Sequence, residues 1–324
     1  MKILVVGVGS IGVRHARNLR KLGVAEVLAI DPDPERLALA REQGATACPT
    51  LEAGLDATPA GVIVCAPPDQ HLAVAGQAVA RGIDVFVEKP IAPAANGVAE
   101  LLDEAARRGR TVSVGYNLRF HPGLRVLRSL LEHGSIGRLL LLRAEFGQYL
   151  PDWRPGHDYR RGYIAQREGG GIILDGSHEL DYVRWLAGEV AAVAAVAGRL
   201  SDLEMAAEDS ALILLRLRSG AIAHVHLDCV QRGYSRACKL IGTEGTLAWD
   251  FEAGVRLFTA ERAKWEEHPV AADVNDMYVD EMRHWLACLR GEAAPVSTGA
   301  DALETLRVAL AVRMAAATGR EVSL

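Results

Sequence analysis

The feature that most constrains this chain is a glycine-rich turn, Gly7-x-Gly9-x-x-Gly12, which directly follows the apolar run Lys2–Val6. The apolar run predicts a buried parallel strand, and a helical pattern follows the turn. Gly7 allows the chain to turn tightly, Gly9 leaves room for phosphates to approach the backbone, and Gly12 lets the helix pack close to the strand. The sequence therefore predicts a dinucleotide-binding turn between a strand and a helix.

The residues around this turn also bear on the choice of dinucleotide. Ser10 and Ile11 open the predicted helix, whose N-terminus faces the negative charge of a pyrophosphate. Asp31 ends the next predicted strand, about 20 residues beyond the third glycine, where a carboxylate grips a ribose hydroxyl. A carboxylate repels a 2′-phosphate, so NAD is favoured over NADP. Arg36 could tolerate such a phosphate, but we expect it to be solvated in the first turn of a helix. The alternative is a glycine turn with no ligand.

Composition limits the remaining possibilities. The chain has 324 residues, which is enough for two domains. Half of its residues are hydrophobic and 24% are charged, as expected for a soluble globular protein. A net charge of −5 argues against general nucleic-acid binding, and no apolar run approaches a membrane span. The predicted strand starts at Lys2, which leaves no room for a signal peptide. Five widely spaced cysteines without a Cys-x-x-Cys pattern indicate reduced thiols in a cytoplasmic protein and do not support a metal site.

Strands and helices alternate over residues 1–120. This alternation predicts an α/β fold, a Rossmann-type doubly wound parallel sheet that binds the dinucleotide. The helices are expected near Ile11–Leu22, Pro34–Gln43, Gln70–Arg81 and Ala94–Arg108. The strands are expected at Lys2–Val6, Glu26–Ile30, Gly61–Cys65, Asp84–Val87 and Thr111–Gly115.

Residues 121–324 have a different pattern, in which strands follow one another with few helices between them. This pattern predicts an α+β domain with an open, largely antiparallel sheet that carries helices mainly on one face. We expect this domain to bind the substrate, and its free, partly polar sheet face to be a subunit interface. The strands are expected at Leu139–Gln148, Val190–Gly198, Ala211–Arg216, Ile222–Cys229, Ala237–Gly242, Thr246–Asp250 and Arg256–Thr259. The helices are expected at Pro122–Glu132, His178–Leu186, Asn275–Leu289 and Asp301–Ala317.

Chemically active residues follow three of the parallel strands, at the ends where such sheets bind ligands. Ala66 and Pro67 follow one strand, and Pro67 can present ring surface to a dinucleotide. Glu88-Lys89-Pro90 follows the next strand, and Asn117 and Arg119 follow the third, Thr111–Gly115. Lys89 is the leading catalytic candidate, because a lysine at this place can polarise a carbonyl or hold a reacting hydroxyl. The alternative is a surface lysine paired with Glu88 or another acid.

A second cluster comprises Gly169-Gly170-Gly171 and the polar residues Asp175, His178 and Asp181. The three polar residues are spaced three apart, so on a helix they share one face. His178 could take the proton of an alcohol as hydride leaves, and Asp175 could orient it or bind substrate hydroxyls. The alternative is that Asp175 or Ser177 is a helix N-cap and His178 a packed first-turn residue.

A polar loop lies between these clusters. Aromatic rings in it can stack on sugars, and arginines can pair with carboxylates or phosphates. A solvated loop without a ligand is the alternative. Its candidate substrate-binding residues are Tyr149, Trp153, Arg154, Tyr159 and Arg160.

Taken together, these patterns resemble the glucose–fructose oxidoreductase / inositol dehydrogenase (Gfo/Idh/MocA) family over essentially the whole chain. The resemblance implies NAD(P)-linked oxidation or reduction of a sugar, polyol or sugar acid, and a homodimer or homotetramer formed through the C-terminal sheet. It implies that Lys89 is the catalytic lysine, with a cis Lys89–Pro90 bond in many relatives. The resemblance rests on the glycine turn, Asp31, Ala66-Pro67 with His71, Glu88-Lys89-Pro90, Asn117 and Arg119, and the triple glycine with Asp175 and His178. We expect Arg119 to bind substrate together with Lys89, Asp175 and His178. We expect the cofactor to be bound by the glycine turn and Asp31 and by Ala66, Pro67, His71, Glu88, Lys89 and Asn117.

Two departures from the family pattern leave details open. Many relatives have Asp-x-x-x-His, whereas here His178 comes only three residues after Asp175, so the roles of Asp175, His178 and Asp181 are not assigned. Many relatives have Thr-Pro in place of Ala66-Pro67. The loop around Trp153 is similar to a subgroup associated with surface-sugar biosynthesis.

The favoured hypothesis is that the protein is an NAD-dependent dehydrogenase that acts on a carbohydrate hydroxyl, with Lys89, His178 and Asp175 as its catalytic residues. A first alternative is a redox-neutral glycoside hydrolase that uses bound NAD, as some relatives do. A second is a cofactor-binding sensor without turnover. Relatives of that kind tend to lose the lysine or the histidine, and this chain has both.

Overall fold

Two compact units make up the computed structural model of the chain. The first unit contains 1–117 together with 274–304, and the second contains 118–273 together with 305–324. The sequence pattern predicts a single division, after residue 120. In the part of the chain that the structure describes, no helix combines the length and the apolar character needed to cross a membrane. The described residues are 1–154, 156, 158–167, 169–270 and 273–324.

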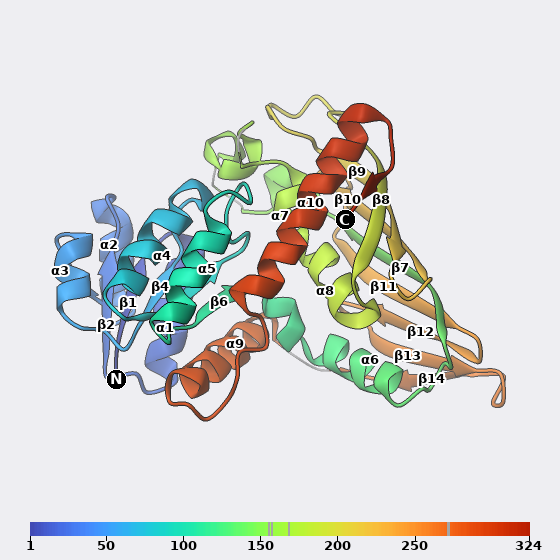
Figure 1. Cartoon of the computed structure of the whole chain (residues 1–324), viewed down its shortest axis with the longest axis horizontal. Helices are drawn as coiled ribbons and strands as arrows, with labels where there is room; N and C mark the ends of the chain where they lie inside the picture. The colour runs from blue at the N-terminus through green and yellow to red at the C-terminus, as the bar shows by residue number, and fades with distance from the viewer. Residues whose placement is uncertain (155, 157, 168, 271–272) are drawn as a thin grey trace. The chain divides into compact units, whose positions relative to one another are not determined.

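The first unit is built on a six-stranded sheet (Figure 1). Its strands are β1 (Lys2–Val6), β2 (Glu26–Ile30), β3 (Thr46–Ala47), β4 (Gly61–Val64), β5 (Asp84–Glu88) and β6 (Val112–Gly115). They lie in the order β3-β2-β1-β4-β5-β6, and every neighbouring pair is parallel. All their carboxyl ends therefore lie at one edge, with the reversal of strand order beside β1.

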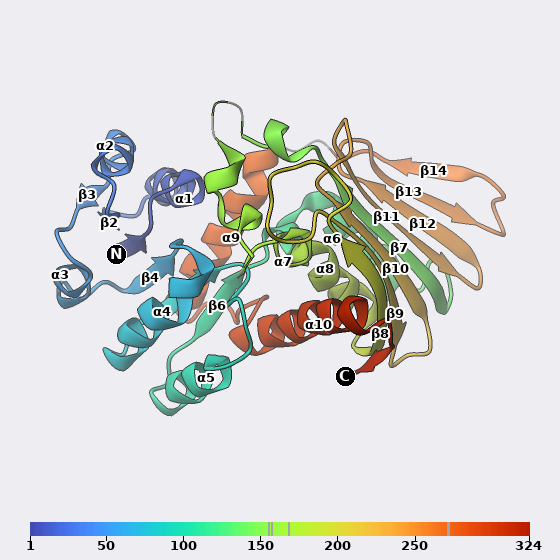
Figure 2. The same ribbon diagram turned by 90° about the horizontal axis from the view of Figure 1, so that it is seen from above.

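Helices cover both faces of this sheet, which explains why the middle residues of its longer strands are apolar and buried. Figure 2 shows α1 on one side of the sheet and α4 and α5 on the other, and α1 packs against α9. Leu4, Ile63 and Val85 have no exposed surface. The helices are α1 (Ser10–Lys21), α2 (Pro34–Glu42), α3 (Leu51–Asp56), α4 (His71–Ala80), α5 (Val98–Arg107) and α9 (Val274–Leu289).

Helix α9 belongs to the first unit although it comes late in the sequence. Its buried residues Met282, Trp285 and Leu286 join the core formed by β1, β2 and α1. The Trp285 ring meets the ring of Phe86 edge-on at 5.8 Å, and a Cβ added at Gly61 would lie 2.8 Å from it. Its position in the sequence predicts that it belongs to the second domain, because the apolar pattern indicates that one face is buried but not against which sheet it packs.

The second unit is built on a nine-stranded sheet in the order β14-β13-β12-β11-β7-β10-β9-β8-β15. Among the described residues of this unit, β7 and β10 alone pair in parallel, and the other neighbouring strands are antiparallel. The strands are β7 (Leu139–Gly147), β8 (Val190–Gly198), β9 (Ser210–Leu217), β10 (Ile222–Asp228), β11 (Ser235–Gly242), β12 (Gly245–Asp250), β13 (Gly254–Thr259), β14 (Trp265–His268) and β15 (Val322–Ser323).

The helices of the second unit lie on one face of this sheet (Figure 2). They are α6 (Pro122–Glu132), α7 (Ile172–Asp175), α8 (Ser177–Ala187) and α10 (Gly299–Thr318), whose first residues belong to the other unit. Strand β9 shows the consequence, since Ile213 and Leu215 are buried whereas Leu212 and Leu214 on the opposite face are half-exposed. Among the described residues, no helix covers that opposite face.

The expected fold class is confirmed in both parts, the parallel α/β sheet and the second, mostly antiparallel sheet with helices. Among the described residues, the strands and α-helices that were not expected are β3, α3, β14, β15 and the separate four-residue helix α7. β3 and β15 have two residues each and α3 has six, which is too few for a recognisable period. The sequence of β14, Trp-Glu-Glu-His, is mostly polar because this strand lies at the sheet edge.

If α9 is part of the core of the first unit, replacing Trp285 should be costly. We expect Trp285→Ala to lower the free energy of unfolding by about 3–5 kcal/mol, through lost burial and a new cavity. Urea denaturation followed by circular dichroism measures this. Trp265→Ala, at a β14 position that is 42% exposed, is the control and should cost about 1 kcal/mol or less. Equal effects of the two changes would contradict the assignment of α9.

Candidate active site

The glycine turn between β1 and α1 has the geometry that a pyrophosphate requires. Gly7 has a positive φ of 85°, and a Cβ there would lie 2.6 Å from the backbone nitrogen of Ala66. A Cβ at Gly12 would lie 2.0 Å from the carbonyl oxygen of Gly7, so α1 can approach β1 only with glycine here. A Cβ at Gly9 would meet nothing within 4 Å. The backbone beside Gly9 is therefore open to a ligand.

The first turn of α1 suits an anion. It starts at Ser10 after the N-cap residue Gly9, which makes no side-chain capping bond, and no acidic residue lies in the first turn. Since N–H groups at a helix N-terminus and the helix dipole favour negative charge, Ser10, Ile11 and Gly12 fit a bound phosphate group.

Asp31 lies at the carboxyl end of β2, directly against the glycine turn. Its carboxylate accepts hydrogen bonds from the backbone N–H of Val8 at 2.8 Å and of Asp33 at 2.9 Å. The guanidinium of Arg36 is 3.9 Å away and more than half exposed. The carboxylate is thus held in place beside the turn, and the residues of this edge fit the ribose and pyrophosphate of NAD.

His71 joins the loops that follow β4 and β5. After Ala66 and Pro67 the chain forms a short 3-10 helix, Pro68–Gln70, which leads into α4 at His71. The ring nitrogens of His71 lie 2.8 Å from the carbonyl oxygen of Ala66 and 2.9 Å from that of Pro90. Burial lowers the pKa of His71, although these two carbonyls favour the charged ring. The structure therefore gives His71 contacts with the backbone of both loops.

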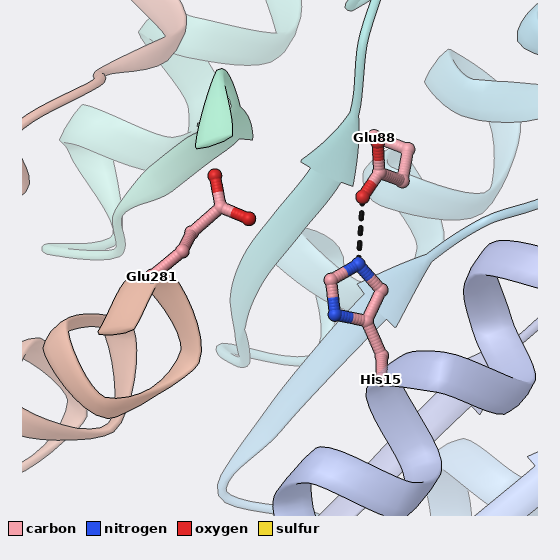
Figure 3. A group of neighbouring side chains, drawn as sticks. All are labelled: His15, Glu88 and Glu281. Carbon is pink, nitrogen blue, oxygen red and sulfur yellow. Dashed lines mark hydrogen bonds and ion pairs between the residues drawn. The ribbon is translucent and has the colours of Figure 1, made fainter. Parts of the chain in front are cut away.

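Lys89 follows β5 at the same edge of the sheet, and the Lys89–Pro90 peptide bond is cis. The neighbouring carboxylate of Glu88 accepts a hydrogen bond from Nε2 of His15 at 2.6 Å (Figure 3). Its other oxygen lies 3.3 Å from the backbone nitrogen of Lys89 itself. The nearest partners of Glu88 are therefore an imidazole of α1 and the backbone of the lysine.

A third buried ionisable group, Glu281 of α9, lies beside this pair (Figure 3). One ligand atom from each of His15, Glu88 and Glu281 lies within 4.8 Å of the others. Sequence reasoning missed His15 and Glu281. The available signal was a polar residue on the buried face of each helix, between Gly12 and Ala16 in α1 and beside Met282 in α9.

Asn117 and Arg119 follow β6, and the unit boundary lies between them. Asn117 is buried in the first unit. In the second unit the guanidinium of Arg119 pairs with the carboxylate of Asp181, with nitrogen–oxygen distances of 2.8 and 2.6 Å. Both side chains are at least 97% buried, and Thr305 donates a further bond to Asp181 at 3.3 Å. Arg119, expected to bind substrate, is thus engaged with Asp181.

The triple glycine leads into a broken helix. Gly171 has a positive φ of 84°, and a Cβ there would lie 2.3 Å from Oε1 of Glu208. Arg313 donates to Glu208 at 2.8 Å and to the carbonyl of Gly170. An ion pair of the second unit thus fixes this turn, and only glycine leaves room for the carboxylate.

The helix break at Gly176 corrects the expectation that Asp175, His178 and Asp181 share one helix face. Asp175 is the last residue of α7, whereas His178 and Asp181 belong to α8. The N-cap of α8 is Gly176, without a side-chain bond, so neither Asp175 nor Ser177 caps this helix. The hydroxyl of Tyr163, a residue that sequence reasoning missed, donates to the Asp175 carboxylate.

The loop after β7 is partly held by its own contacts. The Trp153 indole donates to the carbonyl of Gln148 at 2.9 Å. Exposed Arg160 pairs with Asp158 and Glu204, and its bonds hold the pKa of Asp158 below the usual value. The Arg232 guanidinium lies over the Tyr149 ring, 3.4 Å from its centroid, and the Tyr159 hydroxyl accepts a hydrogen bond from the Glu204 N–H. Arg154 is exposed. Pro155 and His157 lie outside the described residues.

Comparisons with known proteins agree with this geometry. Residues 1–116 match the model of an oxidoreductase family with an NAD-binding Rossmann fold, and residues 124–248 match the GFO/IDH/MocA C-terminal domain. An inositol 2-dehydrogenase of Burkholderia multivorans is 30% identical over 76% of this chain and 72% of its own length. A D-apiose dehydrogenase of Paraburkholderia graminis is 28% identical over 99% of this chain and 88% of its own.

A solved structure is also similar over the whole chain. GenD2 from gentamicin A biosynthesis, crystallised in complex with NAD, superposes with a TM-score of 0.86. It is 25% identical, and the match covers 100% of this chain and 96% of that one. The fold and the glycine turn define an NAD-binding oxidoreductase. The chain belongs to the GFO/IDH/MocA family.

The position of Asp31 predicts how the protein discriminates between dinucleotides. Asp31→Asn keeps a side-chain oxygen for the Val8 N–H but removes the charge that repels a 2′-phosphate. We expect the ratio of NADPH to NADH affinity to rise about tenfold or more, a change of about 1.4 kcal/mol. Fluorescence titration with both reduced cofactors measures the ratio. Asp33→Asn removes the same charge two residues away and should leave the ratio unchanged, so a shift in both variants would contradict a specific role for Asp31.

Proposed function

We propose that this protein oxidises a hydroxyl group of a sugar, polyol or sugar acid, or reduces the corresponding carbonyl, with NAD as its cofactor. The main support is Lys89, which follows β5 at the edge of the sheet that also carries the glycine turn and Asp31. Relatives named as inositol and D-apiose dehydrogenases support the carbohydrate class. The first unit would bind the dinucleotide and the second the substrate.

The side chains have separate tasks in this proposal. When bound, NAD supplies the acceptor or donor of hydride. Lys89 holds the substrate oxygen and polarises its bond to carbon, because an ammonium stabilises negative charge that develops on oxygen. His178 takes the hydroxyl proton during oxidation and returns it during reduction. Asp175, which accepts from Tyr163, orients His178 or a substrate hydroxyl.

The remaining candidates would shape the substrate site. Exposed Arg154 is the residue proposed to meet an anionic group of a sugar acid or nucleotide sugar. Tyr149 and Trp153 would offer ring surfaces to the sugar. Arg119, although paired with Asp181, would act by holding the start of α8 in place.

We also propose a homo-oligomer formed through the helix-free face of the nine-stranded sheet. Along neighbouring strands this face presents Val196, Leu212, Leu214, Leu141 and Ile222, all at least 41% exposed. These side chains share the face with polar residues such as Arg216 and His224. Exposed apolar side chains gathered on one face are typical of subunit interfaces. A cytoplasmic location is proposed on the five cysteines, which are all free.

The catalytic proposal is tested by absorbance at 340 nm, with NAD or NADP and a panel of sugars, polyols, sugar acids and nucleotide sugars. One substrate class should produce NADH. Lys89→Met should then lower kcat by a factor of about 10² to 10⁴, because the reacting oxygen loses its cationic partner. Lys21→Met, a control at the end of α1, should leave kcat unchanged.

Three outcomes would contradict parts of this proposal. An unchanged rate in Lys89→Met would remove the lysine from the mechanism. Glycoside cleavage without net NADH would favour the redox-neutral hydrolase, and NAD binding without any turnover would favour a sensor.

The interface is tested by the charge-inserting substitution Leu214→Glu. A two-fold interface would bring this charge in twice, so we expect monomers in size-exclusion chromatography with light scattering. Leu39→Glu is a control at a similarly exposed position on α2 of the first unit and should leave the oligomer intact. A monomeric wild-type protein, or an oligomeric Leu214→Glu variant, would contradict this interface.

A further inference from the structure

Three ionisable side chains from separate elements meet at Glu88, the residue that precedes the proposed catalytic lysine. His15 comes from the middle of α1, Glu88 from the last position of β5 and Glu281 from α9 (Figure 3). His15 and Glu281 are buried, and the side chain of Glu88 is 13% exposed. Since ionisable groups are seldom buried without a purpose in structure or function, the cluster calls for an explanation.

The carboxylate of Glu88 is confined from several directions. One oxygen accepts from the His15 ring at 2.6 Å, and the other lies 3.3 Å from the backbone nitrogen of Lys89. It also lies against Gly115 of β6, where an added Cβ would be 3.0 Å from Oε2. The orientation of Glu88 is therefore coupled to the backbone of the residue that follows it.

The His15 ring is itself held by packing. It meets the rings of Phe86 and Tyr278 edge-on, with centroid distances of 5.7 and 6.4 Å. Because the carboxylate can only accept, Nε2 of His15 donates the bond in Figure 3. Because Nε2 is bonded directly to the Glu88 carboxylate, the geometry is that of a hydrogen-bonded pair rather than of ligands arranged around a cation.

The nearby carboxylate of Glu281 increases the need for the hydrogen bond from His15 to hold Glu88 in place. The Glu281 carboxylate lies within 4.8 Å of the other two ligand atoms, and like charges at this distance repel each other. Without a donor on His15, Glu88 would be the more exposed and less confined of the two carboxylates. It would then be free to rotate away from Glu281 and toward solvent, which would disturb the Lys89 backbone.

We propose that His15 is a positioning residue: through Glu88 it fixes the backbone that carries Lys89, and with it the lysine ammonium. His71 holds the other side of the same turn through the carbonyl of Pro90. This inference rests on the proposed function of Lys89. It adds a residue on α1, the helix that also opens the cofactor turn, to the reaction machinery.

The test compares substitutions of His15 in the full-length protein. His15→Leu fills much of the same space but cannot donate, so kcat should fall about tenfold to a hundredfold, as expected for a misplaced catalytic group. KM and the affinity for NADH should change less than about threefold. His15→Gln retains a donor that can reach Glu88 and should restore kcat to within about threefold of the wild type.

Asn18→Leu is the matched control on the same helix. Asn18 is buried one turn further along α1 and donates to Asn275 of α9 at 3.2 Å, so its loss destabilises the same packing without touching Glu88. We expect normal kcat in this variant. Gly115→Ala would place a Cβ 3.0 Å from Oε2 of Glu88 and so disturb the same carboxylate from β6. We expect this variant to lower kcat, as His15→Leu does.

A readout without turnover separates this inference from the proposed function. The rate at which an amine reagent labels Lys89, quantified by peptide mass spectrometry, should change at least threefold in His15→Leu and stay at the wild-type value in Asn18→Leu. Such a change in a protein that oxidises no carbohydrate would leave the positioning role intact and reject the function. Wild-type labelling and kcat in His15→Leu, or equal losses in Asn18→Leu, would overturn the inference.

Discussion

Parallel pairing of β1, β2, β4 and β5 is the constraint on which the chemistry of the first unit depends. Because the strands pair in parallel register, their carboxyl ends lie at one edge. The glycine turn, Asp31, Ala66 and Lys89 follow those ends in succession. Gly12 can then approach the carbonyl of Gly7, so α1 lies close to the sheet and His15 can reach Glu88. One backbone arrangement thus serves both the cofactor turn and the lysine.

The second unit differs from the first, because helices cover only one face of its sheet in the part of the chain that the structure describes. Its helices bury one side, and the turn before α7 is fixed by Arg313 and Glu208 around three consecutive glycines. The break at Gly176 then sets Asp175 and His178 on separate short helices. This arrangement accommodates the short Asp-x-x-His spacing, because the two residues do not have to follow a single helical register.

Local patterns predicted much of this structure, and long-range partners account for what they did not predict. The alternation of strands and helices predicted the parallel sheet, the strand–glycine–helix order predicted the dinucleotide turn, and the strand ends indicated Lys89 as a candidate. The sequence did not reveal that α9 packs on the first unit, since periodicity identifies a buried face but not its partner. For the same reason the sequence did not indicate that His15 and Glu281 lie near Glu88, or that Arg119 pairs with Asp181, because these partners are distant in the chain.

In the proposed reaction, hydride would pass directly between a carbohydrate carbon and the nicotinamide at a site that contains Lys89. The most direct test is a single-turnover reaction of the enzyme and NAD with an active carbohydrate deuterated at the carbon that bears the hydroxyl. Mass spectrometry of the cofactor should find one deuterium per NADH formed, and Lys89→Met should slow its appearance. Deuterium that remains on the sugar, or is lost to water, would contradict the account.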